Sequence, residues 1–289
     1  MSEMSLSAAA PLAVDIGSCM RKTRGGKIKT AAITKSGGII NITVFVLLAL
    51  TVYAFFSFDY KDIDIVKALS GTWTNALVVF GSPRLHYNTL SGMIKALGVT
   101  FALGVLSTIF GAITAFFGAL MCARNTAHPV LANVVKSFVA FIRAVPTILW
   151  VLIFTVAAGL GSVAAVIGLS FHSAGYLIKA YAESIEEVDA GTIEALKASG
   201  ASFWQIVFQA IVPSSITYMT AWTFLRFEIN FTNALAVGAA AGAGGIGFDL
   251  FMAGSYYFDL HELGYITYMI VAAVIILEAV ATGIKARVR

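Results

Sequence analysis

The sequence predicts an all-α, polytopic integral membrane protein with about six transmembrane helices. Of its 289 residues, 59% are hydrophobic and 12% are charged, whereas an ordinary soluble domain is about half apolar and a quarter charged. The mean hydropathy is +0.87. The apolar residues also fall in blocks of the roughly 20 residues that a helix needs to cross a bilayer. Lipid therefore sets the fold class.

Several other classes of protein are disfavoured by the same sequence. The net charge of +4 does not indicate nucleic-acid binding, because the basic residues lie beside apolar blocks, where they orient helices in a membrane. Cys19 and Cys122 are far apart, and the four histidines are isolated, so neither a disulfide framework nor a metal site is expected. The chain contains no GxxxxGK[ST] motif and is not expected to bind ATP.

Polar and apolar segments divide the chain into an expected order. Residues 1–38 are interpreted as a cytoplasmic tail, 39–58 as the first transmembrane helix, and 59–89 as an extracytoplasmic loop with a short amphipathic helix. Residues 90–285 form the predicted core, with a cytoplasmic segment at 183–213, and 286–289 form the cytoplasmic C-terminus. The remaining spans are expected at about 91–121, 134–158, 162–182, 213–237 and 263–284.

Small residues recur along the second span at alternating spacings of four and three, at Gly104, Thr108, Gly111, Ala115 and Gly118. This spacing places them on one face of a helix, where small side chains let two helix backbones approach closely in lipid. Packing within the chain is favoured over a contact between two copies.

Basic residues are distributed unequally between the two expected sides of the membrane. Twelve lie on the side of the two termini and four on the other, and none occurs between Arg226 and Lys285. Because cytoplasmic loops carry an excess of Lys and Arg, both termini and residues 183–213 are predicted to be cytoplasmic. The location expected for the chain is a bacterial cytoplasmic (inner) membrane.

The cytoplasmic segment is too polar for a span and is predicted to form two short helices joined by a hinge. Asp189 can cap the first helix, and Gly200 can end it, because glycine adopts the left-handed conformation easily. Ser202 and Gln205 have the spacing of a capping box for the second helix.

This segment resembles the signature of permease subunits of type I ABC importers. The signature, E-A-A, three residues, G, nine residues and I-x-L-P, corresponds to Glu194-Ala195-Leu196, Gly200 and Ala210-Ile211-Val212-Pro213. Leu196 replaces the second alanine, and Ala210 and Val212 are smaller than the usual residues. The resemblance implies that Glu194, Ala195, Leu196, Gly200 and Pro213 couple the chain to an ATP-hydrolysing subunit.

The flanking motifs resemble the phosphonate, phosphite and phosphate branch of that family over about residues 91–289. The motifs are RAVPTILW from Arg143, HSAGYLIKAYAE from His172, RFEIN from Arg226 and GAGGIG from Gly242. The resemblance implies a transport subunit and not an enzyme, acting with a second copy of itself, two ATPase subunits and an extracytoplasmic binding protein. ATP and Mg would be bound by the ATPase, and phosphonate is the leading substrate, with phosphite or phosphate as alternatives.

Three charged residues fall within or near the expected hydrocarbon region, namely Arg143, Arg226 and Glu228. A charge at the centre of a transmembrane helix costs on the order of 3 kcal/mol by insertion scales, so these residues need a reason to be there. One hypothesis is a cationic lining of the translocation path. The other is structural pairing between helices, with Glu278 as the candidate partner of Arg226.

The sequence from Gly242 to Gly247 matches GxGxxG but follows an expected membrane helix instead of a strand, so it does not indicate a dinucleotide site. Gly242, Gly244, Gly245 and Gly247 are predicted to form an irregular turn near the outer gate, because glycine permits backbone angles that other residues resist.

Two alternative functions stay open at this point. An ion-coupled secondary transporter would need inverted repeats and broken helices near the midplane, and no such repeat is evident in the sequence. An ABC permease for an unrelated small solute, such as an amino acid, is the other alternative. An intramembrane enzyme is disfavoured because no pair of residues forms a credible nucleophile and base.

Overall fold

The computed structural model describes residues 35–57 and 64–288, and every regular element in these ranges is a helix. The all-α class is therefore confirmed for the described residues. Most of the expected tail and part of the expected loop at 59–89 lie outside them. The chain divides into two units, residues 1–65 and 66–289. The first unit contains α2, Lys35–Ser57.

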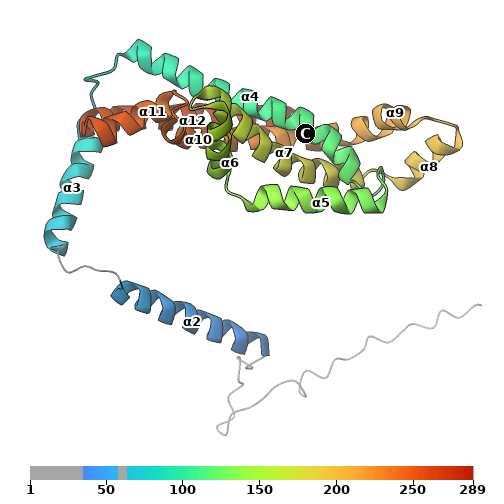
Figure 1. The fold of residues 1–289 in the computed structure, drawn as a ribbon, viewed down its shortest axis with the longest axis horizontal. Coiled ribbons are helices and arrows are strands. Elements are labelled where there is room, and N and C mark those ends of the chain that lie inside the picture. The colour runs from blue at the N-terminus through green and yellow to red at the C-terminus, as the bar shows by residue number, and fades with distance from the viewer. Residues whose placement is uncertain (1–34, 58–63, 289) are drawn as a thin grey trace, which may run out of the picture. The chain divides into compact units, whose positions relative to one another are not determined.

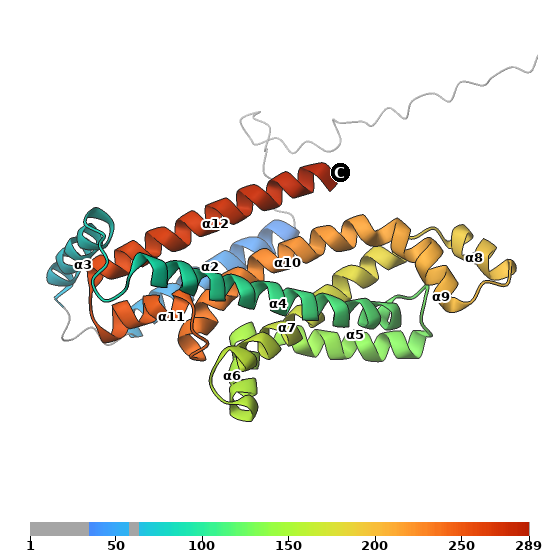
Figure 2. The ribbon, with the colours of Figure 1, turned by 90° about the horizontal axis from the view of Figure 1, so that it is seen from above.

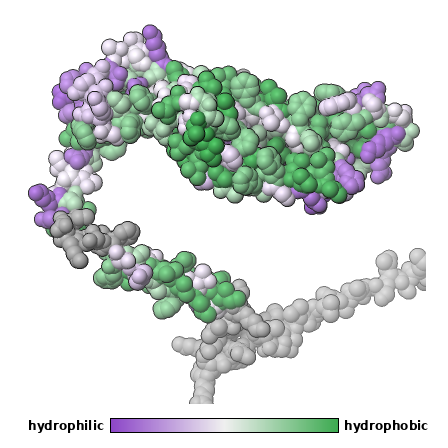
Figure 3. Space-filling view, in the orientation of Figure 1, coloured by the Kyte–Doolittle hydropathy of each residue, from purple (hydrophilic) through white to green (hydrophobic). Residues whose placement is uncertain are grey.

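The second unit contains the remaining helices, shown in Figures 1 and 2. Their bounds are α3 Ile65–Gly81, α4 Leu90–Cys122, α5 Pro129–Ala144, α6 Thr147–Ala158, α7 Ser162–Glu186, α8 Ala190–Ala198, α9 Phe203–Ile206, the π-helix η1 Val207–Ile211, α10 Val212–Ala240, α11 Ile246–Phe251, the π-helix η2 Met252–Tyr256, and α12 Leu260–Val288. α8 and α9 lie at one end of this unit, and α3 and the start of α12 lie at the other. Hydrophobic residues cover much of the visible face between these two more hydrophilic ends (Figure 3).

Four described helices are long and apolar enough to cross a membrane, and a fifth span results if a bent pair is counted as one. The four are Gly37–Ser57, Leu90–Cys122, Ser162–Glu186 and Leu260–Gly283. Helix α10 coincides with the fifth predicted span and has 29 residues, but it is not among these apolar helices. Its polar residues include Arg226, Glu228 and Asn230.

The third predicted span, residues 134–158, is not one continuous helix. This stretch is divided into α5 and α6, whose axes differ by 92°. Pro146 explains the break, because proline lacks a backbone N–H and disfavours helical angles in the residue before it. Val145 accordingly has extended angles, with φ −88° and ψ 126°.

The predicted packing of the small-residue face of α4 within the chain is confirmed. A Cβ atom added at Gly111 would lie 2.7 Å from Cβ of Ser173 on α7, and one added at Gly104 would lie 3.2 Å from Cα of Phe231 on α10. Ala115 is fully buried in a cluster with α7 residues such as Leu177. The absence of larger side chains therefore lets α7 and α10 approach the backbone of α4.

We expect Gly111→Ala to destabilise the protein by about 1–3 kcal/mol, because the added methyl group overpacks a filled contact. Gly98→Ala is the matched control on the same helix, where an added Cβ would meet no atom within 4 Å. The control should be neutral or more stable by up to about 1 kcal/mol, since alanine has the higher helix propensity. Thermal unfolding in detergent measures both, and equal stabilities of the two variants would contradict the contact.

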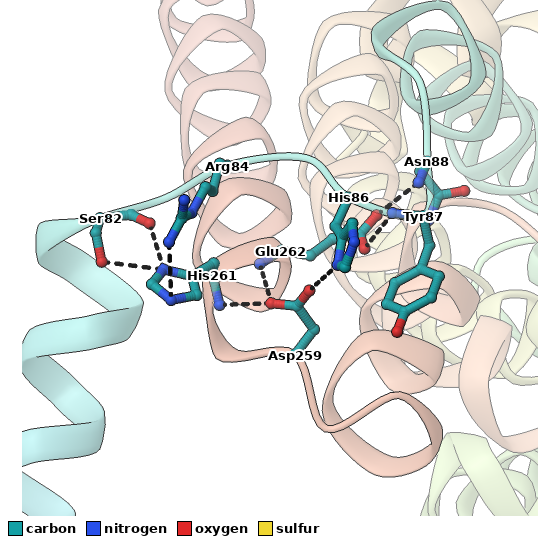
Figure 4. A network of polar contacts seen from close by, with 8 residues as sticks. All are labelled: Ser82, Arg84, His86, Tyr87, Asn88, Asp259, His261 and Glu262. Carbon is teal, nitrogen blue, oxygen red and sulfur yellow. Dashed lines mark hydrogen bonds and ion pairs between the residues drawn. The ribbon is translucent and has the colours of Figure 1, made fainter.

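A polar network holds the segment before α4 against the start of α12 (Figure 4). Glu262 is fully buried, and its carboxylate accepts hydrogen bonds from the backbone N–H groups of Tyr87 (3.0 Å) and Asn88 (2.9 Å). The imidazole of His86 lies 3.1 Å from the carboxylate of Asp259. Burial alone would raise the pKa of Asp259. Hydrogen bonds from the backbone N–H of Glu262 and from His86 lower it by a larger amount, so the net pKa is below its ordinary value.

Candidate functional site

The segment between α7 and α10 begins with a capped helix, as predicted. The carboxylate of Asp189 accepts from the backbone N–H of Thr192 at 2.8 Å. At the other end of α8, Gly200 has φ +80°. The N–H of Gly200 donates to the carbonyl of Lys197 and that of Ala201 to the carbonyl of Leu196, each at 3.0 Å. This is a Schellman turn, which ends α8 and reverses the chain.

The signature residues of α8 face two directions. Leu196 is half-buried and packs against the cluster that contains Ile193, which is 4% exposed, together with residues of α7 and η1. Glu194 and Ala195 are exposed. The helix is therefore attached to the protein core by one face and offers a carboxylate and a small side chain on another. The substitution of leucine for alanine at position 196 falls on the attached face.

The second helix of the segment differs from the prediction. The capping box of Ser202 and Gln205 is present, but the helix that it starts runs through α9 and η1 into α10 without a break. Pro213 therefore lies in the first turn of α10 instead of marking a new helix. Just before it, the N–H of Val212 donates to the carbonyl of Val207, five residues back. Such a π-turn is commonly a single local adjustment inside an α-helix.

A buried polar cluster joins three helices in the middle of the second unit. Arg226 on α10 is 3% exposed, and its Nε donates to the hydroxyl of Ser173 on α7 at 3.0 Å. The amide Nδ2 of Asn230 donates to the hydroxyls of Ser173 (2.8 Å) and of Thr108 on α4 (2.9 Å). One nitrogen of Arg226, Nη2, is buried and has no hydrogen-bond partner.

Tyr176 brings the two predicted arginines near each other. The guanidinium carbon of Arg226 lies 5.3 Å from the centre of the Tyr176 ring, and that of Arg143 lies 5.9 Å from the same centre. Both distances are within the range of a cation–π interaction. Arg143 itself is exposed at the end of α5. Glu228 is half-buried two residues after Arg226 and so projects from a different face of α10.

Glu278, the candidate partner of Arg226 in the structural-pairing hypothesis, does not form an ion pair with it. Glu278 is exposed, whereas Arg226 is buried and bonded to Ser173. Ion pairs that do form include His86 with Asp259, Lys136 with Glu186, and Lys179 with Glu183.

The glycine-rich turn has the irregular backbone that the sequence predicted. Gly242, Gly244 and Gly245 have positive φ values of 58°, 76° and 78°, which L-residues rarely adopt. The backbone N–H of Ile246 donates to the buried hydroxyl of Thr100 on α4 at 3.1 Å. The prediction is wrong for Gly247, which lies in helix α11 instead of the turn and packs directly on the backbone of Leu235. The turn is therefore fixed against α4 and α10, and its role as an outer gate stays a prediction.

The larger part of the chain matches one protein family. Residues 109–289 match the family described as binding-protein-dependent transport system inner membrane component.

The chain belongs to this family.

Similar proteins include two named permeases. The phosphite transport system permease protein PtxC of Stutzerimonas stutzeri is 33% identical over 218 residues, which are 75% of this chain and 78% of that protein. The phosphate-import permease protein PhnE of Mycolicibacterium smegmatis is 29% identical over 211 residues, which are 73% of this chain but only 37% of that protein. As a member of the family, the chain is a transport permease of an ABC importer and not an enzyme, and the secondary-transporter alternative is excluded.

Solved structures share the fold. A chain of the MetNI methionine ABC transporter in an inward-facing conformation superimposes with a TM-score of 0.63 at 21% identity, over 71% of this chain and all of that one. A chain of a bacterial ABC transporter for the acidic polysaccharide alginate gives 0.59 at 13% identity, over 86% and 96%. The permease fold predicted from the signature is confirmed.

Arg226 could be predicted from the sequence, but the residues that hold it were not predicted. Asn230 is four residues after Arg226 and therefore lies on the same face of α10, so this spacing was a usable signal. Thr108 was recognised only as a member of the small-residue face of α4. Ser173 and Tyr176 lie in the motif that begins at His172, but that motif does not show that they contact Arg226, because they come from another helix.

We expect the changes in the free energy of unfolding caused by Arg226→Ala and by Glu278→Ala to add up in the double variant to within about 0.3–0.5 kcal/mol, as for independent sites. Arg226→Ala and Ser173→Ala should instead show a coupling of about 0.5–3 kcal/mol, because the two side chains share a hydrogen bond. Thermal unfolding of both double-mutant cycles in detergent tests this. Strong coupling to Glu278 with none to Ser173 would refute the described cluster.

Proposed function

We propose that two copies of this chain form the membrane path of an ABC importer for a small phosphorus oxyanion, phosphonate foremost, with phosphite or phosphate as alternatives. An extracytoplasmic binding protein would deliver the anion, and two ATPase subunits, which bind ATP and Mg, would drive transport. The substrate class is supported by similarity to permeases named for phosphite and phosphate import. It is also supported by Arg226, whose planar guanidinium can bind an oxyanion through two hydrogen bonds.

The observation that carries the coupling role is the division of α8 into an attached face and a free face. Ile193 and Leu196 fix α8 to the core, while Glu194 and Ala195 are exposed. A partner with a basic group could pair with the carboxylate, and the alanine would allow close approach. Movement of α8 would then reach α10 through the Gly200 turn and the continuous helix from Phe203 to Ala240.

We propose the same orientation that the charge distribution predicts, with both termini and α8 in the cytoplasm. Twelve basic residues on that side against four on the other favour it. The two hydrophilic ends of the second unit fit the two membrane surfaces (Figure 3). The glycine-rich turn and the network around Glu262 would then face outward, where a binding protein would dock.

Amino-acid import is a second candidate substrate class. The probable amino-acid permease protein YxeN of Bacillus subtilis is 31% identical over 137 residues, covering 43% of this chain and 58% of that protein. The match to PtxC is longer. Uptake by the complete transporter would distinguish the two classes, since a phosphonate importer should not be inhibited by excess amino acid.

We expect Glu194→Lys to lower both uptake and binding-protein-stimulated ATP hydrolysis by about 30-fold or more, because reversing a charge at a buried interface pair costs about 2 kcal/mol or more. The matched control is Glu187→Lys, which makes the same charge change at an exposed position before α8. The control should keep most of its activity. If both variants transport at the wild-type rate, α8 is not the coupling element.

A further inference from the structure

A cavity of about 450 Å³ lies among α4, α5 and α7, at the end of α7 that continues into α8. Six charged residues line it, namely Arg124, Lys136, Arg143, Lys179, Glu183 and Glu186. Its size is within the range of roughly 300–1,000 Å³ that small-molecule sites occupy. The lining carries four cationic groups and two carboxylates, so the cavity has a net positive charge.

Two of the four cations are committed to the carboxylates. Lys136 lies 3.0 Å from Glu186, and Lys179 lies 3.5 Å from Glu183. The guanidinium groups of Arg124 and Arg143 take part in none of the ion pairs formed among the described residues. Only the backbone N–H of Arg124 donates to Glu186, at 2.9 Å. Two forked donors therefore stay available to an anion.

Arg143 also connects this cavity with the buried polar cluster. Its guanidinium contacts one Tyr176 ring together with that of Arg226. Positive groups thus follow one another from Arg226, past Tyr176, to Arg143 and the cavity. A sequence of cationic groups attracts an anion along its length, and walls of low dielectric strengthen that attraction.

We propose that this cavity binds the oxyanion group of a phosphorus compound, either the free ion that has passed Arg226 or the headgroup of a membrane phospholipid. Arginine suits this ligand because its planar fork matches two phosphate oxygens. The free-ion form rests on the proposed function, and the lipid form does not. A purely structural role explains Lys136, which joins α5 to the end of α7 through Glu186. The guanidinium groups of Arg124 and Arg143, by contrast, form no ion pair with the described residues.

The test uses the complete transporter, without nucleotide or binding protein, in nanodiscs of phosphatidylcholine with and without phosphatidylglycerol. Binding of radiolabelled inorganic phosphate is measured, and retained lipid is identified by native mass spectrometry. The variants are Arg124→Gln and Arg143→Gln. Lys95→Gln is the matched control, since it makes the same change in net charge at an exposed residue outside the cavity.

Saturable phosphate binding that weakens about 10-fold in both arginine variants but not in the control supports the free ion. Phosphatidylglycerol that is retained by the wild type and the control but lost from both variants supports the lipid headgroup. Absence of both signals from the wild type, or their persistence in both variants, overturns the site. Phosphonate uptake by the wild type is measured separately, so a failure of the proposed function is distinguished from a failure of this cavity.

Discussion

The hydroxyl of Ser173 is the point at which α4, α7 and α10 meet, and the close contact behind it depends on Gly111. Because Gly111 has no side chain, Cβ of Ser173 can lie against the α4 backbone. From there its hydroxyl reaches both Arg226 and Asn230, and Asn230 reaches Thr108. Small residues let the helix backbones come close together, and polar residues form the hydrogen bonds that stabilise helix contacts in lipid. A buried guanidinium is tolerated because this arrangement partly satisfies it.

The same helices connect the polar cluster with α8. The apolar cluster that holds Ile193 of α8 also contains Tyr181 of α7 and Met219 of α10. Through the continuous helix that begins at Phe203, a displacement of α8 would be transmitted along α10 toward Arg226. Packed interfaces of this kind favour discrete rearrangements over gradual deformation. The proposed transport cycle therefore needs no contact between the coupling surface and the anion.

The fold class, the cap at Asp189, the turn at Gly200 and the packing face of α4 could be predicted because each depends on a local pattern or a period. The break at Pro146 had a local signal, but a continuous apolar stretch outweighed it. The partner of Arg226 could not be predicted, since it depends on which helices lie side by side. Glu278 has the opposite charge to Arg226 but is exposed. The observed partner is the uncharged Ser173, which lies 53 residues earlier in the sequence.

The central claim is that α8 is the surface that contacts the ATPase, and site-specific cross-linking tests it most directly. Single cysteines at the exposed positions Ala195 and Ser255 would be compared after replacement of Cys19 and Cys122 by serine. Our account predicts that a short bifunctional maleimide links Ala195→Cys to a cysteine in the ATPase cleft, and that Ser255→Cys, on the proposed outer side, gives no such product. A product from Ser255→Cys and none from Ala195→Cys would contradict the coupling surface and the orientation together.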